Sequence, residues 1–271
     1  AFGALPAGSA TRGHAADALK SAGPRATATR RQLRVRSTLV IAQLALSLML
    51  VATAALLIQS FARLQAEPPG FNADHTLTAS LVLPPAKYGT PEKRAAFAGQ
   101  LTARLAALPG VTGAGLTNNI PFSGGNPQGG YTVEGHRPSP GQPGPHGMVR
   151  QVSPGYFEAM GIPLLRGRLL EPSDTLGRER VVVVDRLLAD RYWPHADPLG
   201  KRITREGGAT QALGTWTIVG VVAPVKHLKL DEPLAKETLY FPYAQASTNN
   251  LTLVVQGAAL SPALTQAVRD A

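Results

Sequence analysis

The most apolar part of the chain is an uncharged run of 26 residues, from Ser37 to Ala62. As a helix this run would be about 39 Å long, at about 1.5 Å per residue, which is enough to cross a hydrocarbon core of about 30 Å with some tilt. It therefore predicts one transmembrane helix over residues 37–62. Uncharged polar residues within it, such as Gln43 and Ser47, are typical of membrane helices that contact other helices.

Two other interpretations compete with a retained span. The core helix of a soluble protein rarely contains so long a stretch without a charge. A secretory signal peptide would use Ala52-Thr53-Ala54 as its cleavage site. However, 36 residues precede the run, and its apolar character continues past Ala54 to Phe61. We therefore expect the helix to remain in the mature protein.

Beyond the span, the spacing of apolar residues predicts a β-α-β unit. Alternating positions over His75–Leu83 indicate a strand. Thr90 is a suitable N-cap for a helix whose apolar residues recur at helical spacing between Phe97 and Leu108. Pro109-Gly110 would end this helix, and Val111–Leu116 indicates the second strand.

The rest of the chain alternates between short apolar segments and turn-rich segments. Residues 119–147 are rich in Gly and Pro and predict a long loop, with one short strand at Tyr131–Glu134. The further predicted strands are Val181–Asp185, Trp216–Val222 and Leu251–Val255, and the predicted helices are Tyr156–Met160, Arg186–Tyr192 and Ser261–Ala271. Together these elements indicate an α+β fold, in which mixed sheets are covered by few helices.

Charge is distributed unevenly along the chain. The first 36 residues hold seven basic side chains and one acid, a net charge of +6, whereas residues 37–271 hold 20 basic and 16 acidic side chains, a net charge of +4. Because basic residues beside a span stay in the cytoplasm, we expect residues 1–36 to be a cytoplasmic segment and residues 63–271 to be periplasmic. The juxtamembrane excess fits contact with the lipid membrane and does not indicate nucleic-acid binding.

No motif indicates an enzyme or a cofactor site. The chain has no cysteine, which excludes disulfides and thiolate sites, and no histidines occur at metalloprotease spacing. His136 and His146 share the Gly/Pro-rich loop and are the candidate metal ligands, although a solvated loop explains them more simply. The Gly200-Lys201 pair lacks the rest of a phosphate-binding loop, so ATP hydrolysis would need another polypeptide.

Other candidate residues have simple structural explanations. Ser123 is flanked by glycine but has no base nearby in the sequence, which favours an exposed turn serine. We interpret the acidic pairs Asp231/Glu232 and Glu171/Asp174 as solvated charges. Asn250-Leu-Thr252 fits a glycosylation sequon, a short motif that arises often by chance. We therefore expect no catalytic, cofactor-binding or metal-binding residues.

Four turn-rich segments with aromatic anchors remain, and each is most simply explained by maintenance of the fold. They are Val152–Phe157, Gly161–Arg168, Tyr192–Ile203 and Trp216–Val222. In this order, after a basic flank and one span, they resemble the extracytoplasmic core domain of MacB/FtsX-type permeases, the membrane subunits of a class of ABC transporters. The agreement is best with the duplicated-permease branch of these proteins. Further agreeing segments are Arg36–Leu48, Ser60–Leu64, Pro69–Phe71, Leu105–Val111 and Leu239–Gln245.

The resemblance implies a two-lobed extracytoplasmic domain and a non-catalytic role. A porter-like β-α-β lobe would combine residues 72–118 with the C-terminal part, and an inserted mixed lobe would lie within residues 119–235. Residues 1–20 are similar to the tail of a preceding permease unit, so the chain is expected to be a fragment whose periplasmic domain is incomplete at the C-terminus. Coupling residues are not assigned.

The implied function is export or mechanical signalling at the bacterial inner membrane. The domain would transmit ATP-driven movement of membrane helices to a substrate or to a periplasmic partner. Implied partners are a separate ATPase subunit, a second permease unit (dimer or tandem pseudo-dimer) and a periplasmic adaptor, with no cofactor. Two other classes stay open: a single-span anchored binding or sensor domain, and an anchored hydrolase.

Overall fold

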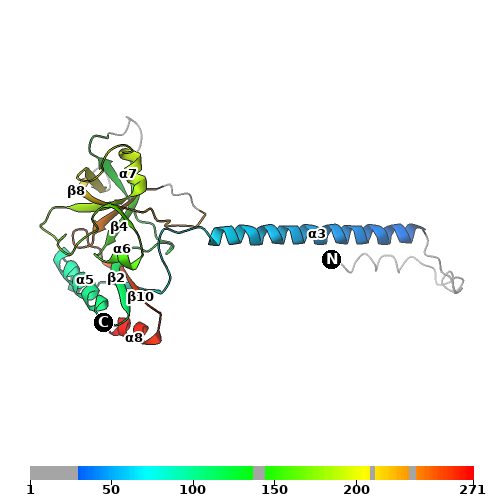
Figure 1. Ribbon diagram of the computed structural model, residues 1–271, viewed down its shortest axis with the longest axis horizontal. Coiled ribbons are helices and arrows are strands. Elements are labelled where there is room, and N and C mark those ends of the chain that lie inside the picture. Colours follow the sequence, from blue (N-terminus) through cyan, green and yellow to red (C-terminus); the bar gives the residue numbers. More distant parts are fainter. Residues whose placement is uncertain (1–29, 137–143, 208–210, 232–235) are drawn as a thin grey trace. The chain divides into compact units, whose positions relative to one another are not determined.

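The computed structural model describes residues 30–136, 144–207, 211–231 and 236–271 (Figure 1). Most of the expected cytoplasmic segment, including residues 1–20, therefore lies outside the described residues, as does part of the Gly/Pro-rich loop. The chain divides into two compact units, Ala1–Arg63 and Leu64–Ala271.

The described part of the first unit belongs to a long helix, α3, over Arg30–Gln65, whose last two residues lie in the second unit. Its segment Gln32–Gln65 is long and apolar enough to cross a membrane, and none of its most apolar stretch is buried within the chain. This exposure contradicts the interpretation as a soluble core helix. Two polar side chains bond to the helix itself: Thr38 donates to the Arg34 carbonyl at 2.9 Å and Thr53 to the Met49 carbonyl at 2.8 Å. Such bonds satisfy hydroxyl groups in a lipid environment.

The second unit is a mixed α and β domain, as the sequence predicted. Its strands are β1 Thr76–Val82, β2 Val111–Thr117, β3 Gln128–Val133, β4 His146–Val152, β5 Leu164–Gly167, β6 Val181–Asp185, β7 Arg202–Gly207, β8 Gln211–Val222, β9 Thr238–Pro242 and β10 Asn250–Gly257. Its helices are α4 Pro85–Tyr88, α5 Pro91–Ala106, α6 Tyr156–Ala159, α7 Arg186–Tyr192 and α8 Pro262–Asp270.

All of these strands belong to one hydrogen-bonded sheet, not to several sheets as expected. The order is β1-β10-β2-β4-β3-β7-β8-β6-β9, with β5 added to β8. Strand β9 also pairs in parallel with β4, so that β4, β3, β7, β8, β6 and β9 form a closed ring of pairings. Four strands, β4, β5, β7 and β9, were not foreseen. The short strand predicted at Tyr131–Glu134 corresponds to the second half of β3, but all of β3 and the start of β4 lie within the segment otherwise interpreted as a loop.

The ring encloses its own hydrophobic core. Alternate residues of the strands point inward, with Trp216 and Ile218 from β8 and Leu239 and Phe241 from β9. The valine run of β6 separates two cores, because Val182 and Val184 face the ring interior whereas Val181 and Val183 face a second cluster around α6. A strand buried on both faces needs a continuous apolar run, and this explains the sequence of β6.

The remaining strands extend the sheet beyond the ring. Strands β1 and β2 each pair antiparallel with β10, which lies between them. Figure 1 shows α5 and α8 beside this part of the sheet, and a third core there includes Leu105, Leu116 and Leu264. Helix α5 begins as predicted, since the Lys93 N–H donates to Thr90 Oγ1 at 3.4 Å.

Candidate functional site

The segment that follows α3 is attached to the domain almost at once. Glu67 pairs with the Lys226 amine at 3.0 Å, only two residues after the helix ends at Gln65. The Lys226 N–H donates to the Pro69 carbonyl at 2.9 Å, and the Asn72 N–H donates to the Met160 carbonyl at 2.8 Å. Only about two residues therefore separate the end of α3 from its first side-chain contact with the domain.

Close backbone packing completes this attachment. Gly70 has φ +87°, and a Cβ atom there would lie 2.3 Å from the Pro224 carbonyl oxygen, so only glycine fits. The ring of Phe71 lies 5.7 Å from that of Phe122, and the Phe122 N–H donates to the His227 carbonyl at 2.8 Å. We call the three segments 67–72, 119–123 and 224–230 the junction. The sequence gave no indication that these three segments meet.

Two buried titratable side chains are linked through Thr238: His227 lies within the junction, and Asp185 lies at the end of β6. His227 Nε2 shares a hydrogen bond of 3.1 Å with Thr238 Oγ1, and burial, together with the charge of Arg150, lowers the pKa of His227 to about 3. Asp185 caps α7 by accepting from the Leu188 N–H at 2.9 Å, and it accepts from the Thr238 N–H at the same distance. Burial raises the pKa of Asp185 to about 7, against the opposing effect of these two hydrogen bonds.

Arg150 of β4 is fully buried, which the sequence did not indicate. It donates to the carbonyls of Val149 at 3.1 Å and Pro127 at 3.3 Å. No carboxylate lies within ion-pair distance of it in the part of the chain that the structure describes. Burial accordingly lowers the pKa of Arg150. These contacts hold the guanidinium among strands and explain it as a structural group.

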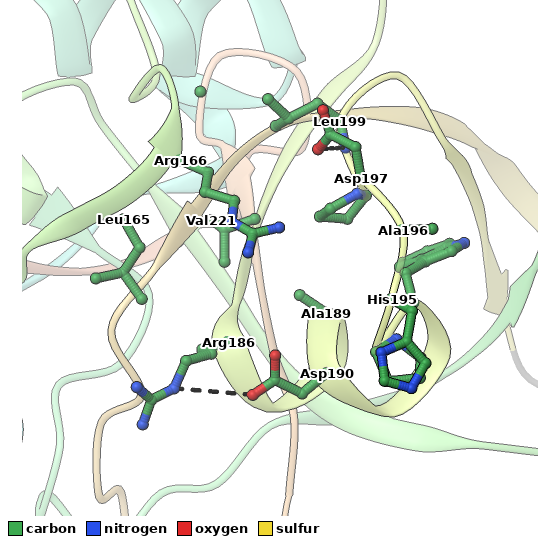
Figure 2. Close-up of a pocket in the computed structure, with 14 residues that line it drawn as sticks. Leu165, Arg166, Arg186, Ala189, Asp190, His195, Ala196, Asp197, Leu199 and Val221 are labelled. Carbon is green, nitrogen blue, oxygen red and sulfur yellow. Dashed lines mark hydrogen bonds and ion pairs between the residues drawn. The ribbon is translucent and has the colours of Figure 1, made fainter.

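A polar pocket of about 810 Å³ lies between α7, the turn that follows it and β5 (Figure 2). Arg186 and Asp190 form a long ion pair of 3.9 Å at its side, and Figure 2 shows the Arg166 side chain reaching into the space beside Asp190. Asp197 accepts from the Leu199 N–H at 3.1 Å. The lining combines charges of both signs but includes no Ser, Thr, Cys, Tyr or Lys side chain. This composition suits recognition of a polar group.

The acidic residues weighed from the sequence differ in their surroundings. Asp174 is buried and accepts two hydrogen bonds from Arg168, at 2.8 and 2.9 Å, and one from the Glu171 N–H. Burial alone would raise the pKa of Asp174, but these donors hold it below its usual value. The prediction that Asp174 is a solvated charge was therefore wrong, whereas the Glu171 side chain is 54% exposed. Asp231 is exposed, and Glu232 lies outside the described residues.

The remaining candidates occupy structural positions. Ser123 is exposed in a turn, where its hydroxyl donates to the Ile120 carbonyl at 2.8 Å. The His136 ring contacts Tyr192 edge-on, whereas His146 Nδ1 bonds to the Gly144 carbonyl at 2.8 Å. Among the residues described, no group of three His, Cys, Asp or Glu side chains could hold a metal ion.

Comparison with protein families identifies the family of this chain. The profile of the family described as "MacB-like periplasmic core domain" matches residues 37–271. The chain belongs to this family. A MacB-like domain is part of an ABC transporter permease, which agrees with the resemblance noted in the sequence. The family is a transporter component and not a typical class of enzyme.

Solved structures of MacB-like domains are also similar to this chain. The periplasmic region of MacB from Actinobacillus actinomycetemcomitans is 17% identical, with a TM-score of 0.45, over 74% of this chain and 83% of that one. The extracellular domain of the noncanonic ABC-type transporter YknZ from Gram-positive bacteria is 16% identical, with a TM-score of 0.42, over 71% and 88%. A search of curated proteins found no match. The family and the apolar helix together indicate a membrane-anchored protein with an extracytoplasmic domain.

Proposed function

We propose that this domain transmits ATP-driven movement of membrane helices to an exported substrate or to a periplasmic partner. The observation that carries the proposal is the short connection at the junction. Two residues separate Gln65, the end of α3, from the ion pair between Glu67 and Lys226. Two extended residues reach at most about 7 Å, so a larger displacement of the helix end has to move the domain or break the junction.

The proposal gives each part of the chain a role. Residues 1–36 form the basic cytoplasmic segment, residues 37–62 the transmembrane helix, and residues 63–271 the periplasmic core domain at the inner membrane. The β1-β10-β2 part with α5 and α8 corresponds to the porter-like lobe, and the closed ring to the inserted lobe. A separate ATPase subunit is the proposed source of the movement. A second permease unit and a periplasmic adaptor complete the proposed assembly.

A flexible insertion at the junction tests this function. A short Gly-Ser segment inserted after Gln65 in the full transporter should abolish export while ATP hydrolysis continues, because the added chain absorbs the movement of the helix. The same insertion after Gly177, in an exposed turn of the domain, is the matched control and should leave both activities in place. Export that survives the insertion after Gln65 would contradict mechanical transmission through this connection.

The proposed orientation has its own test. Arg34 and Arg36 lie at the start of the apolar run, and replacing both with Glu should weaken the preference for a cytoplasmic N-terminal side. Reporter fusions on the domain measure the fraction of molecules in each orientation. If the domain stays fully outside in the double variant, these two residues do not dominate the topology.

The pocket in Figure 2 favours a second candidate, a single-span anchored binding or sensor domain. The sequence of the parent gene separates the two. Further apolar spans downstream, a matching unit upstream and a neighbouring ATPase gene would support the permease. A stop codon soon after residue 271, with no other span, would support the sensor.

A further inference from the structure

We propose that the domain also contacts the bilayer surface directly, through a membrane-contact patch formed by Phe122, Leu228 and Lys229. The inferred partner is the headgroup layer of the membrane that α3 crosses. This contact goes beyond the transmission of movement and does not depend on it. It requires only that α3 spans the membrane.

The connectivity of the chain places this patch near the membrane. Pro69 lies four residues after Gln65, the last residue of α3, and its carbonyl accepts a hydrogen bond from the Lys226 N–H. Four residues reach at most about 14 Å. The turn that carries Leu228 and Lys229 therefore starts within a short distance of the point where the helix leaves the membrane, whatever the orientation of the domain.

The side chains of the patch suit a lipid interface. Phe122 is 39% exposed and Leu228 is 37% exposed, and the hydrogen bond from the Phe122 N–H to the His227 carbonyl places them in neighbouring turns. Lys229 is exposed and has no ion-pair partner within the described segments. Apolar side chains can enter the boundary between headgroups and acyl chains while a lysine amine reaches the phosphates.

The backbone at Phe122 gives independent support. Its φ is +61°, a left-handed conformation that is strained for a bulky residue. The strain is maintained by the bond to His227 and by packing against Phe71, and its result is an exposed aromatic ring. Strain that persists in order to expose an apolar side chain indicates a function for that side chain.

Apolar insertion drives this contact more than charge does. The amine of Lys226 is already engaged by Glu67 and by the Leu230 carbonyl. The exposed Asp231 offsets the charge of Lys229. We therefore expect binding to a neutral phosphatidylcholine surface as well as to an anionic one, with little dependence on salt.

The absence of cysteine from the sequence permits a direct test. Leu228→Cys in the full chain carries an environment-sensitive fluorophore, in phosphatidylcholine nanodiscs that hold one chain each. Leu213→Cys is the matched control: it is 46% exposed and lies near the other end of β8, about 30 Å from Val222 at 3.3 Å per residue. Brominated lipid should quench most of the fluorescence at position 228 and little of that at position 213.

A second variant separates lipid contact from structural support. Phe122→Gly removes the ring and relieves the strain, so the fold should persist, as judged by tryptophan fluorescence, while quenching at position 228 falls. Equal quenching at positions 228 and 213 would overturn the proposal. A spectral shift that occurs only in vesicles crowded with chains, and not in single-chain nanodiscs, would also overturn it and would assign the patch to a second copy of the chain.

Discussion

Two buried groups that both bond to Thr238 should make the stability of the domain respond to acid in opposite directions. His227 is held neutral by burial, with a pKa of about 3 against an ordinary value of 6.5. Its contribution to stability is complete above pH 6.5 and is lost as the pH falls toward 3, because the unfolded chain then binds a proton that the folded domain refuses. At pH 4.5 the loss is about 3 kcal/mol, at about 1.4 kcal/mol per pH unit.

Asp185 has the reverse effect. Burial raises its pKa to about 7 from an ordinary value of 3.8. The folded domain therefore binds a proton between about pH 7 and pH 4 that the unfolded chain does not, and stability is gained on acidification and lost as the pH rises. Between pH 7.5 and 4.5 the gain is about 3 kcal/mol. The contributions of the two groups in the wild-type chain should nearly cancel over this range.

Single variants reveal each contribution. His227→Gln keeps an amide that can bond to Thr238, and its domain should gain about 3 kcal/mol on acidification from pH 7.5 to 4.5. Asp185→Asn removes the titrating carboxyl, so only His227 responds to pH, and this variant should lose about 3 kcal/mol on acidification over the same range. The double variant should again vary little with pH.

Urea unfolding of the detergent-solubilised chain measures these changes. Both tryptophans, Trp193 and Trp216, are buried in the core of the ring, so their fluorescence reports on the domain and not on α3. His195→Gln serves as control, because the His195 side chain is exposed, and it should match the wild type. If both single variants show the pH dependence of the wild type, the assignment of opposing buried charges is wrong.

Two further predictions concern single positions. Gly70→Ala should destabilise the domain by about 2–4 kcal/mol in the same urea assay, because of steric overlap as well as strain. Gly110→Ala is the control: Gly110 has a similar positive φ but lies in open space, so the substitution should cost about 1 kcal/mol. Equal costs at the two positions would remove the case for close packing at the junction. Asp174→Asn should cost about 1–3 kcal/mol through the loss of its bonds from Arg168, and the exposed Glu171→Gln should change stability by less than about 0.5 kcal/mol. If Asp174→Asn leaves the free energy of unfolding unchanged, the ion pair with Arg168 does not contribute to stability.

Elements defined by local signals could be predicted from the sequence. Helix α7 occupies the predicted residues Arg186–Tyr192. The start of α5 follows from Thr90 and Pro91, whose roles depend only on the next few residues. The valine run of β6 is fully buried, as expected from its composition. In each case the signal, a capping residue or an apolar run, lies within one short segment, and this is why the sequence shows it.

Features created by distant pairings could not be predicted. Strand β4 contains His146 and Arg150, and its burial depends on parallel pairing with β9, about 90 residues away. The junction depends on Glu67 and Lys226, which are 159 positions apart. No local sequence pattern in either member of these pairs indicates the other member. The candidate site therefore emerges only when the chain is folded, although the family could be recognised from its turn-rich segments.

The position of β10 between β1 and β2 imposes an order on synthesis and export. The two strands that leave the membrane first, β1 and β2, each pair with β10 along one edge, and β10 emerges more than 130 residues after β2 begins. Until then their apolar faces and unpaired edges are open to association with other chains. The ring can close earlier, since its last strand ends at Pro242. Maturation of the domain should therefore proceed from its middle outward, and its earliest segment should be the last to be protected from association with other chains.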